Sequence, residues 1–320
     1  MARLRPVCRL VVGRFEAVKA VFSIHFGIYL VTCLIIGCGY LGFRVATLWQ
    51  QQGQSVIALT RKPERSAWLA EHGITGIVGD VTQPETLNQL PKADIVLVAV
   101  GMDRSMYSDV EMVYVGGLKS VLAKLPSRPK HLVYVSSTGV YGDFGGQWVD
   151  EESTTDPLRP GGEACLKAEQ LIHESEFGGQ ATVLRFAGIY GPDRVPTKQR
   201  IESGDWKKLS SAGFLNLIHV DDGARIVDQV SKTQPAGETY LVSDGNPVLR
   251  RDYYSYIAEC LGVDQIPWSE TEVDPKSARS GSNKRISNKK LNDQFDIELQ
   301  YPDYRSGLEQ AMDVEKEGQE

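Results

Sequence analysis

A glycine-rich corner near the start of the chain restricts its fold more than any other feature. The apolar run Val31–Gly37 is typical of a buried β-strand, and it continues directly into the GxGxxG sequence Gly37-Cys38-Gly39-Tyr40-Leu41-Gly42, which opens a helical segment. The first glycine permits a tight turn, the second lets a ligand approach the backbone, and the third lets helix and strand pack closely. The corner therefore predicts a βαβ unit.

Backbone amide groups at this corner predict a dinucleotide site. A helix N-terminus offers free N–H groups and a favourable dipole to a pyrophosphate. The residues expected to form this phosphate site are Gly37, Gly39, Tyr40, Leu41 and Gly42. Because another apolar strand follows the helix, the unit predicts a nicotinamide dinucleotide as cofactor.

The residue after the second expected strand, Ser55–Thr60, indicates which dinucleotide is preferred. An NAD-specific site carries an acidic residue here that binds the ribose 2′-hydroxyl, whereas this chain has Arg61. A guanidinium suits a 2′-phosphate, so we predict that NADP(H) is preferred and leave NAD(H) open. Lys62 and Arg65 follow, either as further phosphate ligands or as solvated surface charges.

Beyond residue 30, short β-branched runs alternate with helix-length segments. Such alternation is typical of a parallel sheet covered by helices on both faces. The expected strands are 31–37, 55–60, 76–80, 94–101, 131–137 and 182–188, with helices at 42–52, 110–125 and 163–174. We predict an α/β fold with a Rossmann doubly wound parallel sheet over 31–190. Residues 191–320 should form mainly a smaller C-terminal α/β substrate lobe, with 214–232 returning to the Rossmann domain.

Composition limits the classes of partner. The formal net charge of −6 argues against nucleic acid or an anionic membrane, because both call for a basic face. The five cysteines are scattered, without a CxxC pair or a metal-ligand spacing. We therefore expect no metal site and a reducing, cytoplasmic location.

The first thirty residues have a different composition. Their first half is basic, and the run from Ala20 to Gly37 is apolar enough to raise the question of a membrane anchor. The second half of that run is needed for the first strand. Two interpretations of residues 1–30 remain, an organelle-targeting peptide and a non-native extension from an upstream start codon.

Four further motifs point to one superfamily. They are VSSTGVYG (Val135–Gly142), LRFAGIYGP (Leu184–Pro192), NLIHVDD (Asn216–Asp222) and KRISNKKL (Lys284–Leu291). Together with the glycine motif, they resemble the extended short-chain dehydrogenase/reductase superfamily, in its branch of NAD-dependent epimerases and dehydratases, over roughly residues 31–310. The resemblance implies contacts to adenine, ribose and nicotinamide from three pairs of residues, namely Asp80 and Val81, Val100 and Gly101, and Gly188 and Ile189.

The resemblance also implies an active site of a tyrosine, a lysine four residues later and a hydroxyl side chain. Ser137, with Thr138 as the alternative, matches the hydroxyl position, and Lys167 matches the lysine that also holds the nicotinamide ribose. Glu163 occupies the tyrosine position, although a carboxylic acid ordinarily titrates about six pH units below a phenol. Glu163 can act as a base, act as an acid if burial retains its proton, or form a surface ion pair with Lys167. Tyr141 offers a phenol nearby, as a proton donor or as a packing residue.

Two residues further along have alternative roles. Arg285 matches an arginine that holds a nucleotide-sugar diphosphate in related enzymes, or it is a solvated surface charge. His219 is expected to be structural, at a hinge between the lobes, with Asp221 or Asp222 capping the helix that follows.

These residues predict an NAD(P)-dependent oxidoreductase or epimerase-like enzyme that acts on a nucleotide-sugar or another small carbonyl or carbinol substrate. The missing tyrosine leaves a second hypothesis open, a catalytically degenerate NADP(H)-binding sensor or scaffold. The expected partner is a small-molecule substrate, and the helices at 110–125 and 163–174 leave a homodimer open.

Overall fold

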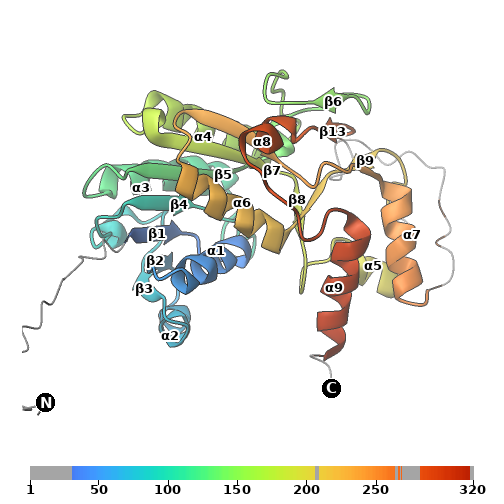
Figure 1. Ribbon diagram of the computed structural model, residues 1–320, viewed down its shortest axis with the longest axis horizontal. Helices are drawn as coiled ribbons and strands as arrows, with labels where there is room; N and C mark the ends of the chain where they lie inside the picture. The colour runs from blue at the N-terminus through green and yellow to red at the C-terminus, as the bar shows by residue number, and fades with distance from the viewer. Residues whose placement is uncertain (1–30, 206–208, 264–265, 267, 269–281, 318–320) are drawn as a thin grey trace, which may run out of the picture.

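Seven parallel strands form the central sheet. The computed structural model describes residues 31–205, 209–263, 266, 268 and 282–317, so the predicted extension, 1–30, lies outside the described residues. The order in the sheet is β11-β7-β5-β4-β1-β2-β3, and every neighbouring pair runs parallel, so the predicted Rossmann fold is confirmed (Figure 1). The strands are β1 (Thr32–Ile36), β2 (Ser55–Thr60), β3 (Thr75–Val78), β4 (Ile95–Val98), β5 (His131–Ser137), β7 (Ala181–Phe186) and β11 (Glu238–Val242).

Helices cover both faces of the sheet because successive side chains of each strand point to opposite sides. Cys33 and Ile35 of β1 share a core with α1, α2 and α6, whereas Leu34 and Ile36 share one with α3 and α4. All four side chains are fully buried, which accounts for the unbroken apolar run in the sequence. These helices are α1 (Tyr40–Gln51), α2 (Pro63–Glu71), α3 (Gly117–Lys124), α4 (Pro160–Glu174) and α6 (Val220–Thr233), with a π-helix (Met112–Gly116) before α3 and 3₁₀ turns at Pro84–Leu87, Thr138–Val140 and Gly178–Gln180.

The part of the chain that returns to the main sheet is longer than predicted. The sequence indicates a return over 214–232, where α6 does pack against α1. β11 then also joins the sheet as an edge strand beside β7. Tyr240 and Val242 of β11 enter the same apolar core as α1. This short strand carries no motif, and its place depends on pairing with β7.

Most of the remaining elements form a group that we call the smaller lobe, at one end of the molecule beyond the main sheet (Figure 1). The smaller lobe has a second core that contains Tyr190, Tyr253, Ile257 and Leu308. Its elements are β8 (Gly188–Tyr190), β9 (Phe214–Leu215), β10 (Leu217–His219), β12 (Val248–Leu249), α5 (Lys198–Glu202), α7 (Arg250–Cys260) and α9 (Tyr304–Glu317).

Three further elements lie outside this core. β6 (Trp148–Val149) pairs with β13 (Arg285–Ile286), and α8 (Lys289–Gln294) packs against β11 of the main sheet. No helix among the described residues is both long and apolar enough to span a membrane.

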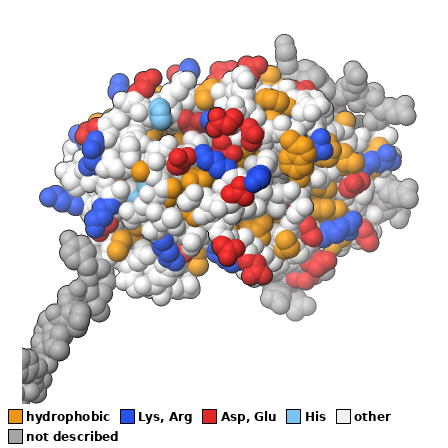
Figure 2. Space-filling model, turned by 45° about the horizontal axis from the view of Figure 1, so that its top comes forward, with side chains coloured by type: hydrophobic (Ala, Val, Ile, Leu, Met, Phe, Trp, Pro, Cys, Tyr) orange, Lys and Arg blue, Asp and Glu red, His pale blue; other side chains and the backbone are white. Residues whose placement is uncertain are grey.

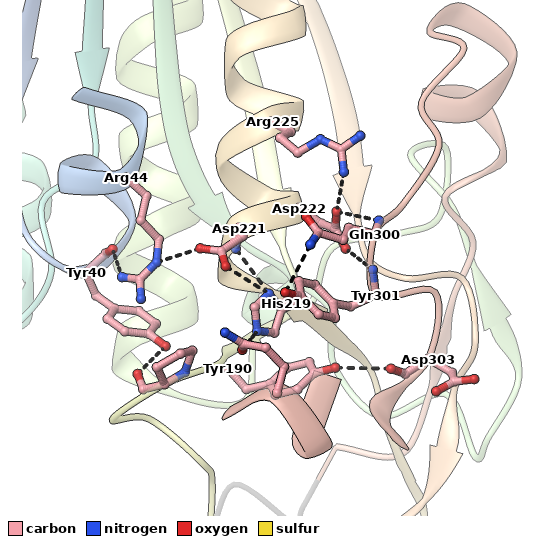
Figure 3. A network of polar contacts seen from close by, with 12 residues as sticks. Tyr40, Arg44, Tyr190, His219, Asp221, Asp222, Arg225, Gln300, Tyr301 and Asp303 are labelled. Atoms are coloured by element: carbon pink, nitrogen blue, oxygen red, sulfur yellow. Dashed lines mark hydrogen bonds and ion pairs between the residues drawn. The ribbon is translucent and has the colours of Figure 1, made fainter. Parts of the chain in front are cut away.

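His219 is the N-cap of α6, so the predicted capping by Asp221 or Asp222 is wrong. The imidazole Nδ1 of His219 accepts the backbone N–H of Asp221 at 3.4 Å. Asp222 is buried and accepts the N–H groups of Gln300 and Tyr301 at 2.8 Å each (Figure 3). The carboxylate is therefore used to hold the C-terminal segment against α6.

A buried ion pair connects α4 to β7. Arg185 donates to both carboxylate oxygens of Glu169, at 3.1 and 2.7 Å, and to the hydroxyl of Tyr141 at 2.7 Å. The side chains of Arg185 and Glu169 are only 11% and 8% exposed. Glu169 also accepts a hydrogen bond from Ser136 at the end of β5. This group therefore positions α4 relative to β5 and to the loop that follows it.

Removing only one partner of the Arg185–Glu169 pair should lower the free energy of unfolding far more than removing both. We expect Glu169→Leu to lower the free energy of unfolding by about 3–5 kcal/mol, because it leaves the Arg185 charge buried without a counter-ion. The double variant Glu169→Leu/Arg185→Met should lose much less than that. Urea unfolding of the wild type and the two variants measures both values, and a double variant at least as unstable as Glu169→Leu would contradict the expectation.

Candidate functional site

The predicted cofactor positions all lie at the carboxyl ends of strands in the main sheet. Parallel strands have their carboxyl ends on the same side, so these segments lie next to one another. β1 and β4 are neighbours, but the helices after them pack on opposite faces, which makes their carboxyl ends the switch point at which such sheets bind ligands. The segments are Gly37–Gly42 after β1, Arg61 after β2, Asp80 and Val81 after β3, Val100 and Gly101 after β4, Ser137 and Thr138 at β5, and Gly188 and Ile189 after β7.

The three glycines of the corner differ in what they do. Gly37 has a φ of +97°, and a Cβ there would lie 2.5 Å from the carbonyl oxygen of Ala99. A Cβ on Gly42 would collide with the carbonyl oxygen of Gly37. Gly39 is exposed at the N-terminus of α1, and among the described residues no atom lies within 4 Å of the position of its Cβ. The fold requires Gly37 and Gly42, whereas Gly39 leaves open space in front of a helix N-terminus, which fits a pyrophosphate.

The side chains of Tyr40 and Leu41 make contacts within the protein, so these two residues offer a ligand mainly their backbone groups. Leu41 is buried in the core beside β1. The Tyr40 hydroxyl donates to the carbonyl oxygen of Pro192 at 2.8 Å, and burial raises its pKa to about 12. One turn further along α1, Arg44 pairs with Asp221 of α6 at 2.8 Å (Figure 3). These contacts connect the start of α1 to α6 and to the segment that follows β8.

Arg61 lies at the expected place but already has a partner. Its guanidinium pairs with Asp103 at 2.7 Å and lies over the ring of Tyr107, 5.4 Å from the ring centroid. Tyr107 in turn donates its hydroxyl to Asp80. Arg65 instead stacks over the ring of Trp68, 3.8 Å from the centroid, which gives that guanidinium a structural contact of its own.

The valines predicted to line the cofactor are largely part of the core. Val81 is 8% exposed and belongs to the cluster beneath α3, and Val100 packs against the same cluster. Gly101 and Gly188 are exposed, and Ile189 is half-buried. Val81 therefore offers a ligand mainly its main-chain groups, whereas the half-buried Val100 also reaches the surface.

The candidate catalytic residues come from β5 and α4. Ser137 ends β5, is half-buried, and accepts the N–H of Gly139 at 3.0 Å, next to Thr138. Lys167 of α4 is half-exposed and pairs with Glu111 at 2.7 Å, a contact that raises its pKa. The ion pair predicted between Lys167 and Glu163 is thus replaced by one with Glu111. Glu163 lies exposed on the first turn of α4, so the burial that an acid role requires is missing.

Tyr141 is buried and packed inside the protein. Its side chain is 1% exposed, and burial raises its pKa to about 12. The hydroxyl donates to the carbonyl oxygen of Asp150 at 2.8 Å and accepts from Arg185. Both hydrogen-bonding functions of this phenol are therefore used inside the protein.

Sequence reasoning missed several charged residues near these positions. Asp103 and Glu111 lie in the segment after β4, which carries no motif, so only the fold shows that they meet Arg61 and Lys167. Lys284 is buried and donates to the carbonyl oxygen of Tyr141 at 3.1 Å, and burial lowers its pKa to about 8. Its position in the motif KRISNKKL was the available signal.

Arg285 is held in a fixed orientation on β13. Its guanidinium lies between the rings of Trp148 and Phe214, 5.2 Å from each centroid, and its Nε donates to the carbonyl oxygen of Gly146 at 2.7 Å. The two terminal nitrogens of the Arg285 guanidinium take no part in that hydrogen bond.

On the face of the molecule shown in Figure 2, acidic and basic side chains are interspersed.

Comparison with known proteins agrees with this geometry. The sequence pattern described as the NAD dependent epimerase/dehydratase family matches residues 33–243, which run from β1 to the segment just after β11. The chain belongs to this family. Protein YeeZ of Escherichia coli strain K12 is 26% identical over 274 residues, 84% of this chain and 96% of that protein.

Two other proteins extend the comparison. The 4-hydroxy-2-methyl-3-oxo-4-farnesyl-3,4-dihydroquinoline-1-oxide ketoreductase of Stigmatella aurantiaca is 28% identical over 240 residues, 71% of this chain and 72% of that enzyme. A solved structure from Methylobacillus flagellatus, described as a candidate NAD-dependent epimerase/dehydratase, superposes with a TM-score of 0.72. It is 29% identical, with 90% of this chain and 99% of the other covered. The expectation of a nicotinamide cofactor is thereby confirmed at the level of the family.

Gly39 allows the phosphate site to be tested apart from the fold. We expect Gly39→Val to fold and to unfold at a slightly lower temperature, because valine is a poorer N-cap than glycine. It should lose dinucleotide binding by at least about tenfold, because its side chain would occupy the space for the pyrophosphate. Thermal unfolding and titration with NADPH measure the two effects. Gly179→Ala, at another position with open space around the added Cβ, is the control and should change neither. Tight binding by Gly39→Val would place the dinucleotide elsewhere.

Proposed function

We propose that this protein is a cytoplasmic NADP(H)-preferring oxidoreductase or epimerase-like enzyme that acts on a small carbonyl or carbinol substrate. One observation carries the proposal, namely the open space in front of Gly39 at the β1–β4 switch point, with the Arg61 guanidinium at the end of the adjacent strand. The amide groups would hold the pyrophosphate and Arg61 the 2′-phosphate. A homodimer through α3 and α4 stays a prediction.

The other residues have roles consistent with this placement. A bound nicotinamide would supply or accept a hydride at a carbon that carries oxygen. Ser137, at the carboxyl end of β5, would orient the substrate oxygen. Lys167 would hold the nicotinamide ribose once it separates from Glu111. Both side chains reach the surface at this side of the sheet.

Arg285 supports an anionic or nucleotide-sugar-like substrate. The rings of Trp148 and Phe214 hold the guanidinium in place, which lowers the entropy lost when it binds a phosphate group. The similarity to a ketoreductase supports a carbonyl substrate without a required sugar. We therefore propose a carbonyl or carbinol group as the common feature and a nucleotide-sugar as one member of that class.

The position of Glu163 favours a second candidate function, an NADP(H)-binding sensor or scaffold without hydride transfer. An exposed carboxylate on the first turn of α4 stands where the family resemblance requires a phenol. The buried Tyr141 does not replace that phenol, because its hydroxyl is held by Arg185 and Asp150. Binding without turnover would be the signature of this function.

Arg61 should determine the preference between the two dinucleotides. We expect Arg61→Ala to weaken NADPH binding roughly 10- to 100-fold, because a charge-assisted contact to the 2′-phosphate is lost. NADH has no such phosphate, so its affinity should change less than about twofold. Fluorescence titration measures both, with Lys92→Ala as the control, because this exposed lysine precedes β4 and so lies at the opposite end of the strands. Equal effects on the two cofactors would reject the role of Arg61.

Glu163 should distinguish the enzyme from the sensor. We expect Glu163→Tyr to raise reduction of carbonyl compounds, followed at the nicotinamide absorbance, by about 100-fold, since general acid catalysis contributes factors of this size. Glu163→Phe, which has the ring without the hydroxyl, should give no increase. The panel includes sugar nucleotides, ketones and the corresponding alcohols. Tight NADPH binding without turnover in either the wild type or Glu163→Tyr would favour the sensor.

A further inference from the structure

The segment Gly101–Glu111, which follows β4, brings carboxylates to the two cations assigned to the cofactor. Asp103 pairs with Arg61, and Glu111 pairs with Lys167, each at 2.7 Å. We propose that Asp103 is a specificity-determining residue, which competes with the cofactor 2′-phosphate for Arg61 and so limits the preference for NADP(H) over NAD(H). This inference rests on the proposed function of the site.

The turn that follows Asp103 fixes the orientation of the Asp103 carboxylate. Its Oδ1 accepts the backbone N–H of Ser105 at 3.1 Å and the Ser105 hydroxyl, which leaves Oδ2 directed at Arg61. The Asp103 carbonyl oxygen accepts the N–H groups of Met106 and Tyr107 at 3.2 and 3.0 Å. Little conformational entropy is therefore lost in forming the ion pair, which makes Asp103 an effective competitor.

Tyr107 attaches the same turn to the adjacent strand end. Its ring lies against the Arg61 guanidinium, and its hydroxyl donates to Asp80 after β3. Asp80 also accepts hydrogen bonds from the N–H and hydroxyl of Thr82 at 2.9 and 2.8 Å. The segment thus spans the ends of β2 and β3 and keeps Asp103 beside Arg61.

The negative charge of Asp103 affects only a cofactor that carries a 2′-phosphate. Hydrogen bonds from Ser105 and Arg61 lower the pKa of Asp103 to about 2, so the carboxylate is ionised throughout the physiological range. A 2′-phosphate must displace the carboxylate from Arg61 or lie beside another negative group. NADH has a neutral 2′-hydroxyl at this place and carries no such penalty. Asp103 therefore acts on NADPH selectively.

Glu111 provides a contrast within the same segment. Its partner Lys167 is expected to hold the nicotinamide ribose, which both cofactors share. Releasing Lys167 should therefore change the affinities for NADPH and NADH by the same factor. The cations that pair with the two carboxylates would meet different parts of the cofactor, so a Glu111 variant serves as the control for an Asp103 variant.

The experiment measures the affinities of the full-length protein for NADPH and NADH by fluorescence titration. Asp103→Asn keeps the acceptor for Ser105 but removes the charge, and we expect it to tighten NADPH binding roughly two- to fivefold, the range of an exposed ion pair, with NADH unchanged. Asp103→Ala should shift NADPH in the same direction. Glu111→Gln should shift both cofactors equally, and Glu71→Gln, at the exposed far end of α2, should shift neither.

A double variant tests whether the effect passes through Arg61. In the Arg61→Ala background no ion pair is left to break, and Asp103→Asn relieves only the repulsion between the carboxylate and the 2′-phosphate. Asp103→Asn should therefore change NADPH affinity by a different factor there than in the wild type, and an equal factor in both backgrounds would show that the effect does not pass through Arg61. The inference is overturned if Asp103→Asn weakens NADH binding, since Asp103 would then be a ribose ligand, or if it changes both cofactors equally. If Asp103→Asn changes neither affinity while Arg61→Ala still weakens NADPH binding selectively, this inference is overturned and the proposed function stands. If the wild type binds neither dinucleotide, the proposed function fails as well.

Discussion

The close approach of the chain after β1 to the chain after β4 determines where the rest of the site lies. Gly37 can lie against Ala99 only because it lacks a side chain and has a positive φ. This approach turns the chain sharply into α1 and directs the amide groups of its first turn towards the edge of the sheet. Arg61, Ser137 and the other candidate residues are placed relative to that corner by parallel strand pairing.

The charged groups of this structure serve two different purposes. Arg185 and Glu169 are buried, and their hydrogen bonds hold α4 against β5 and β7, where removal of one partner leaves an unpaired charge. Arg61 and Lys167 are partly exposed at the edge of the sheet and pair with carboxylates from one surface segment. Exposed pairs of that kind contribute little stability, so a phosphate can replace the carboxylate at a small free-energy cost.

The position of Glu163 is where this chain departs from the pattern of the superfamily it resembles. The supporting parts of the site remain, because β5, α4 and the Arg185–Glu169 pair still hold Ser137 and Lys167 on neighbouring elements. The proposed cofactor site depends on the glycine corner and Lys167, whereas the proposed hydride transfer also needs a proton donor, so the two proposals can be tested separately.

The sequence by itself determined the parallel sheet, the glycine corner and the basic residue after β2, because strand burial and turn geometry are local requirements that residue types express directly. The cap of α6 is also a local contact, but the sequence analysis assigned it to Asp221 or Asp222 instead of His219. The sequence did not reveal β11 or the carboxylates of Asp103 and Glu111, because their contacts join segments far apart in the chain and follow no local pattern. Only the tertiary structure decided them, since pairing and charge neutralisation depend on which segments the packed sheet brings together.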